Sequence, residues 1–169
     1  MGSGRTRRSP HPFRHTDGCL VDTVARPDTT YMQTSYLTNQ LLVAMPALGD
    51  PNFSHTVTLI CEHTPDGALG IVINRPLEMT LSEVFSQLDL HAGDNALGSQ
   101  PVLRGGPVRP ERGFVLHAPM SDDKPPFDTT LNLSPQLQVT TSRDILTAMA
   151  SGTGPEEAVV ALGYAGWGA

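Results

Sequence analysis

The triplet Cys61-Glu62-His63 is the first place in this sequence where residue types and spacing point to chemistry. On a β-strand alternate residues share a face, so Cys61 and His63 would lie together about 7 Å apart while Glu62 points away. A thiol beside an imidazole can lose its proton near neutral pH and react as a thiolate. A small buried cysteine on a core face explains the same pattern, and we favour that simpler interpretation.

Four further polar residues are candidates for ligand binding, namely Arg75, Arg112, His117 and Arg143. Arg75 and Arg112 each adjoin a proline or glycine at the predicted end of a strand, where they would line one polar cleft with His117. Arg143 falls in the first turn of a predicted helix, where free N–H groups attract anions. Exposed turn residues and ordinary helix capping are the alternatives, and they are the commoner outcome.

Recognised cofactor and catalytic motifs do not occur in the sequence. Cys61, His63 and His117 are three potential metal ligands, but there is no CxxC, HxH or HExxH, so we assign no metal site. Neither the P-loop motif nor GxGxxG is present, and the Gly-Gly-Pro run at 105–107 is more simply a sharp turn. The GxSxG elbow of hydrolases is also missing. We therefore assign no catalytic residue and no cofactor, and an enzyme is the less favoured interpretation.

Short strands and two helices must position these residues. Two capping boxes precede the predicted helices, Thr80–Glu83 before 81–88 and Thr141–Asp144 before 145–149. The irregular mixing of strands and helices favours an α+β fold over a βαβ alternation. Apolar runs predict strands at 41–45, 57–62, 68–73, 102–104, 113–117, 137–139 and 159–164, with a proline-rich loop over 119–130.

Charge and apolar content narrow the class of protein. Residues 1–31 hold five arginines against three aspartates, a net charge of +2, whereas residues 32–169 hold six basic against 14 acidic residues, a net charge of −8. An acidic main body disfavours direct nucleic-acid binding. The longest apolar run, 41–45, is far shorter than the roughly 20 residues of a membrane span, and no secretory signal follows the N-terminal arginines. With only two cysteines, Cys19 and Cys61, a reducing cytoplasm is the expected location.

Seven sequence blocks stand in a specific order: LLVAMPALGDPNF (41–53), ICEH (60–63), GALGIVINRP (67–76), LRGGPV (103–108), RGFVLH (112–117), TTSRDIL (140–146) and LGYAGWG (162–168). Their order and spacing closely resemble those of the YqgE/AlgH family of bacterial proteins. The resemblance implies a single α+β domain with a mixed, barrel-like β-sheet flanked by helices. It also implies a cytoplasmic protein of unestablished biochemical function, since one branch is named only for a proposed role in regulating alginate biosynthesis.

The resemblance covers residues 36–169, which we expect to form the YqgE/AlgH-like domain. Residues 1–35 are expected to be a disordered extension, because nearly all of this segment lacks hydrophobic periodicity. Family members commonly continue past Trp167 with a helix, so we expect the domain to be truncated at its C-terminus. The favoured function is a non-enzymatic regulatory module that binds a protein or small-molecule partner. The alternative is a thiol-dependent redox sensor or enzyme that uses Cys61 with His63.

Overall fold

The computed structural model describes residues 36–91, 96–121 and 126–169, so the extension predicted at 1–35 lies outside the described residues. The described part has the predicted α+β fold, with nine strands in one sheet and two α-helices. Its elements, in chain order, are β1 (Leu41–Val43), β2 (Val57–Thr64), β3 (Gly67–Val72), β4 (Pro76–Thr80), α1 (Leu81–Gln87), the 3-10 helix η1 (Ala96–Ser99), β5 (Pro101–Arg104), β6 (Val108–His117), β7 (Thr130–Ser134), β8 (Leu137–Thr140), α2 (Arg143–Ala150) and β9 (Ala158–Gly168).

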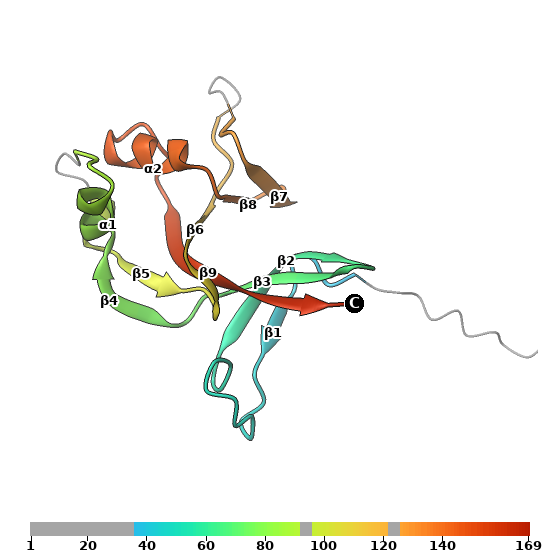
Figure 1. The fold of residues 1–169 in the computed structure, drawn as a ribbon. Coiled ribbons are helices and arrows are strands. Elements are labelled where there is room, and N and C mark those ends of the chain that lie inside the picture. The colour runs from blue at the N-terminus through green and yellow to red at the C-terminus, as the bar shows by residue number, and fades with distance from the viewer. Residues whose placement is uncertain (1–35, 92–95, 122–125) are drawn as a thin grey trace, which may run out of the picture. The chain divides into compact units, whose positions relative to one another are not determined.

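The main path of the sheet runs β1-β2-β3-β9-β6-β8-β7, and β4 and β5 join it beside β9. All strand pairs are antiparallel except β5 with β9, so the sheet is mixed. β2 contacts β7 although the two strands lie near opposite ends of this order. The sheet is therefore curled into a half-barrel, as Figure 1 shows.

β9 is the central strand because it pairs with β3, β5 and β6 along its length. The turn at 105–107 carries the chain from β5, on one edge of β9, to β6 on the other edge. A Cβ on Gly106 would lie 2.2 Å from the carbonyl carbon of Tyr164, and Gly163 has a φ of +76°. Glycine is required at both positions because one backbone touches the other there.

Two apolar clusters pack on opposite faces of β6. Val115 faces the helices, together with Phe85 of α1 and Ile145 of α2. Phe114 faces the inside of the curled sheet, together with Cys61 of β2. Because successive strand residues point to opposite faces, β6 separates a core covered by helices from a core enclosed by strands.

Several strands differ from the prediction, and three of the differences have a clear reason or consequence. β4, for which no strand was predicted, starts at Pro76, because a proline at the first position of an edge strand does not interrupt the ladder. β7 begins at Thr130, the last residue of the predicted loop, and it was missed although Leu131 and Leu133 alternate with polar residues in its sequence. β6 starts five residues before the predicted strand at 113–117, since it contains an irregularity between Val108 and Gly113.

The two helix starts differ in how well the sequence predicted them. The first capping box is confirmed, because Glu83 Oε2 accepts the backbone N–H of Thr80 at 2.7 Å. The second is wrong by one residue, since Ser142 and not Thr141 is the N-cap of α2 and donates its hydroxyl to Asp144. In the described ranges, no helix is long and apolar enough to cross a membrane.

Candidate functional site

Cys61 lies inside the curled sheet, with only 1% of its surface exposed. It is the extra residue of a β-bulge, because Ile60 and Glu62 pair with consecutive residues of β3. Its Sγ contacts the carbonyl of Leu59 at 3.7 Å. Burial raises the pKa of the Cys61 thiol to about 12, so the side chain is protonated at neutral pH.

His63 is engaged with the chain segment that precedes β1. Its Nδ1 accepts the backbone N–H of Leu37 at 2.9 Å, and its ring contacts the Tyr36 ring edge-on at 5.7 Å. The backbone N–H of His63 also donates to Thr38 Oγ1 at 3.1 Å. These contacts explain His63 as a residue that attaches the segment 36–38 to the end of β2.

A cavity of about 180 Å³, called here the cysteine cavity, adjoins Cys61. Arg112 is placed there with its guanidinium carbon 5.6 Å above the ring of Phe114. The lining contains one acid, Glu62, and one cation, Arg112. The lining residues are Cys61, Glu62, Leu69, Arg112, Phe114, Thr129, Thr130, Leu131, Val139 and Thr141.

His117 is buried at the end of β6 and connects three strands. Its Nδ1 donates to the carbonyl of Ala118 at 2.8 Å, so in the neutral ring Nε2 accepts the hydroxyl of Thr140 at 2.8 Å. The Thr140 oxygen in turn lies 2.8 Å from the hydroxyl of Thr130. Burial lowers the pKa of His117, and the contact with the Ala118 carbonyl opposes this effect only in part. The network favours a structural role for a neutral imidazole.

Arg143 joins the two helices, because its guanidinium donates to the carbonyl of Leu88 at the end of α1. The start of α2 already has an anion, the Asp144 carboxylate, which accepts the N–H of Ile145 at 2.8 Å. Burial raises the pKa of Asp144, but hydrogen bonds, first among them that of Ser142, lower the pKa by a larger amount, so the net shift is downward. Ordinary capping thus explains this helix start.

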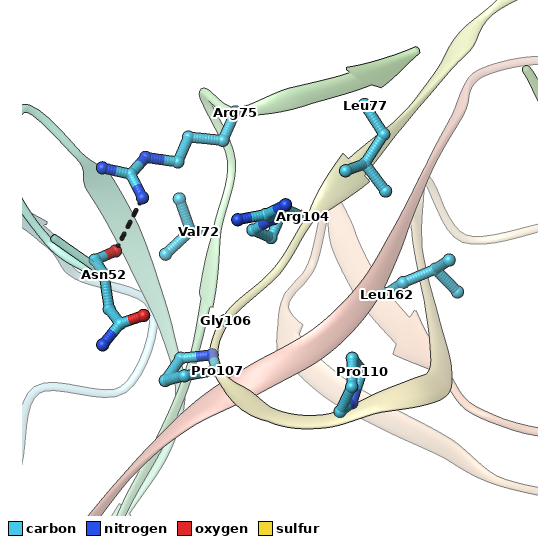
Figure 2. A pocket seen from close by; sticks show the side chains of 9 residues that line it. All are labelled: Asn52, Val72, Arg75, Leu77, Arg104, Gly106, Pro107, Pro110 and Leu162. Carbon is cyan, nitrogen blue, oxygen red and sulfur yellow. Dashed lines mark hydrogen bonds between the residues drawn. The ribbon is translucent and has the colours of Figure 1, made fainter. Parts of the chain in front are cut away.

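A third region, called here the arginine pocket, has a volume of about 270 Å³. Figure 2 shows Arg75, just before β4, extending toward Asn52, and Arg104 at the end of β5, with Pro107 and Pro110 across from them. The lining residues are Asn52, Val72, Arg75, Leu77, Arg104, Gly106, Pro107, Pro110 and Leu162. This lining contains two cations and no carboxylate.

Arg75 is fixed by the loop between β1 and β2. Its Nη1 donates to the carbonyls of Pro51 and Asn52 at 3.0 and 3.1 Å, and its Nη2 donates to the carbonyl of Ser54 at 2.7 Å. Neutral acceptors hold the guanidinium in place without cancelling its charge. Arg75 therefore presents a preorganised positive charge at the edge of the pocket.

Arg104 is the pocket residue that the sequence analysis missed. Its backbone N–H donates to the carbonyl of Arg75 at 2.8 Å, which places the two residues side by side. Its side chain is exposed, and among the described residues its guanidinium forms no hydrogen bond or ion pair with the protein. The signal was present, since Arg104 adjoins a glycine at a strand end in the same way as Arg112 adjoins Gly113.

The sequence-predicted candidates do not converge on one cleft. Arg75 lines the arginine pocket, Arg112 lines the cysteine cavity, and His117 is buried in a hydrogen-bond network. Arg143 lines a fourth place, a helix-side cavity of about 380 Å³ between α1, α2 and β6. The part of the chain that the structure describes contains no group of three or more His, Cys, Asp or Glu side chains arranged to hold a metal ion.

Comparison with known proteins places this geometry in a family. A family model described as AlgH-like matches residues 41–169. A UPF0301 protein of Xanthomonas campestris pv. campestris is 56% identical over 133 residues, which cover 79% of this chain and 69% of that protein. A UPF0301 protein of Xanthomonas oryzae pv. oryzae is 55% identical over the same length.

Two solved structures have the same fold. The solution structure of the AlgH protein from Pseudomonas aeruginosa matches with a TM-score of 0.65 and 46% identity, covering 80% of this chain and 69% of that one. The crystal structure of the protein DIP2367 from Corynebacterium diphtheriae matches with a TM-score of 0.60 at 17% identity, covering 79% and 68% of the two chains. The second match concerns the fold alone.

Proposed function

The chain belongs to the AlgH-like family, whose biochemical function is unknown, and from this premise we propose that it is a non-enzymatic module that binds a small anionic ligand. The ligand's negative group would lie in the arginine pocket. A cytoplasmic location is part of the proposal, resting on the family resemblance and on the free, buried thiol of Cys61.

The observation that carries the proposal is the unpaired guanidinium of Arg104. The domain is acidic, yet among the described residues no carboxylate pairs with Arg104 or with its neighbour Arg75. Apolar side chains such as Val72 and Leu77 line the same pocket. A concave, mostly apolar site with a few convergent polar groups is typical of small-molecule binding. The planar guanidinium of Arg104 matches the geometry of carboxylate and phosphate oxygens, while Arg75, whose terminal N–H groups are bonded to the loop, adds positive charge.

The contacts of Arg75 with the loop at 51–54 also support a regulatory role for ligand binding. Its guanidinium holds the loop at 51–54 through three backbone carbonyls. A ligand that contacts Arg75 shares this group with the loop, so occupancy and loop conformation are thermodynamically coupled. A module whose surface loop responds to a ligand can pass that information to a partner protein.

The thiol alternative has less support. A catalytic or redox-sensing cysteine is ordinarily an exposed thiol with a lowered pKa. Burial raises the pKa of Cys61, and the ring of His63 is bonded to the segment before β1. Both observations favour an inert Cys61.

The proposal is tested by the affinity for acetate and inorganic phosphate at constant ionic strength. Arg104→Gln should weaken binding by roughly tenfold or more, because hydrogen bonds to charged groups contribute about 1.5 to 3 kcal/mol. Arg112→Gln is the matched control, since Arg112 lines the cysteine cavity, and it should leave the affinity unchanged. Equal affinities in wild-type protein and Arg104→Gln would refute the proposal.

A further inference from the structure

The arginine pocket and the helix-side cavity are neighbours that share their walls. Leu162 of β9 lines both of them. β4 contributes Leu77 to the first and Met79 to the second, and residues two apart on a strand point to the same side. The irregular part of β6 contributes Pro110 to the first and Glu111 to the second. Three separate chain segments therefore line both hollows, which places the two hollows next to each other.

Charge is distributed unequally along this path. The arginine pocket is lined by Arg75 and Arg104 without an acid. The helix-side cavity is lined by one cation, Arg143, which is bonded to the carbonyl of Leu88, and by one acid, Glu111. A ligand that spans both hollows meets net positive charge at one end only.

The helix-side cavity is also suited to an apolar chain. Its lining includes Val84 of α1, Leu88 at the C-cap of α1 and Leu146 of α2, which belong to or pack against the core beneath the helices. Leu162 and Val115 also line it, and the uncharged polar residues of the lining are Gln87, Thr140, Thr141 and Ser142. An alkyl chain in this position removes apolar surface from water on both sides, which stabilises the complex.

We propose that the ligand is an amphipathic monoanion, an unbranched alkyl carboxylate, whose head group lies between Arg75 and Arg104 and whose chain passes Leu162 into the helix-side cavity. This inference rests on the proposed function, because it assigns the anionic group to the same pocket. It adds the orientation of the ligand and the apolar character of its remaining part.

Gly113 provides a specific way to block the chain. It lines the helix-side cavity and shares a face of β6 with Val115, and a Cβ added to it would meet no atom within 4 Å. Gly113→Val therefore fills empty space without a backbone clash, and a β-branched residue suits a strand. Gly168→Val is the matched control, because Gly168 is also in a strand, has open space around its Cβ position and lies outside both hollows.

The test is a titration of the full chain with acetate, butyrate, hexanoate and octanoate, with octan-1-ol as the uncharged probe. In the wild-type protein, affinity should rise roughly fourfold for each additional buried methylene. Octan-1-ol should bind more weakly than octanoate, and Arg104→Gln should remove that difference. Gly113→Val should flatten the dependence on chain length while leaving acetate affinity unchanged, and Gly168→Val should retain the wild-type dependence.

Each contrary outcome has a distinct meaning. Acetate binding that depends on Arg104 but does not strengthen with chain length would overturn this inference and leave the proposed function standing. Absence of any carboxylate binding would overturn both. A chain-length dependence that persists in a folded Gly113→Val protein would place the chain elsewhere and overturn the inference. Gly113→Ala serves as the smaller variant if the valine protein does not fold, and it should give an intermediate dependence.

Discussion

The arginine pocket and the cysteine cavity differ in how each treats charge. The cysteine cavity adjoins the inside of the curled sheet, where burial keeps the thiol of Cys61 neutral, and its lining contains one acid, Glu62, beside one cation, Arg112. The arginine pocket keeps two guanidinium groups without an acid in its lining. Arg104 is exposed and Arg75 is bonded to backbone carbonyls, so water and neutral acceptors tolerate both charges without an acid, whereas the thiol of Cys61 is buried and neutral. The arginine pocket is therefore the site that can still accept an anionic group, although it contains no nucleophile.

The largest expected effect concerns the reactivity of Cys61. Its pKa of about 12, against 9.0 for a free thiol, lowers the thiolate fraction by roughly a thousandfold at neutral pH. In a Cys19→Ser background, a thiol reagent should therefore modify native protein at least about a thousandfold more slowly than protein unfolded in urea. Comparable rates in the two states would mean that the cysteine cavity holds a reactive thiolate, and the claim that Cys61 is neutral and inert would be wrong.

The next effect concerns Gly106, which lines the arginine pocket at the point where its backbone touches that of Tyr164. Gly106→Ala places a Cβ against the backbone of Tyr164, so the free energy of unfolding should fall by more than about 3 kcal/mol. Gly113→Ala is the control, and its stability should stay within about 0.5 kcal/mol of wild type. Urea unfolding measures both free energies, and equal stabilities would show that the backbone contact between Gly106 and Tyr164 does not require glycine.

A smaller effect separates the two arginines of the pocket. Arg75→Gln removes hydrogen bonds to the loop at 51–54, so stability should fall by about 1 kcal/mol. Arg104→Gln should leave the unfolding free energy unchanged, because its guanidinium has no partner among the described residues. A destabilised Arg104→Gln protein would mean that Arg104 has a structural partner and is not reserved for a ligand.

The smallest expected effect is a pH dependence of the unfolding free energy that arises from the buried His117. Burial lowers the pKa of His117 below its usual value of 6.5, so the unfolded chain binds this proton more readily than the folded chain. The stability that His117 contributes should be complete above about pH 6.5 and should decrease as the pH falls below that value. His117→Gln should make the unfolding free energy less dependent on pH between 7 and 5. An unchanged slope would show that His117 is not held neutral.

Local sequence rules predicted the start of α1 but missed β7 and the place of Arg104 in a pocket. The T-x-x-E pattern located the start of α1, because the Thr80–Glu83 capping contact is made by residues three apart. β7 carries a local signal, the alternation of Leu131 and Leu133 with polar residues, but its pairing with β8 and its contact with β2 are tertiary. Arg104 adjoins a glycine in the sequence as Arg112 does, but its position beside Arg75 is set by the pairing of distant segments, which the local sequence does not show.

The most direct test of the central claim is to find where a small anion binds. Backbone amide chemical shifts should be followed during an acetate titration of the wild-type and Arg104→Gln proteins. We predict shifts at amides beside the arginine pocket, such as those of Val72, Arg104 and Leu162, and their loss in Arg104→Gln. Shifts centred on Cys61 and Val139, or a response that Arg104→Gln leaves intact, would contradict the account.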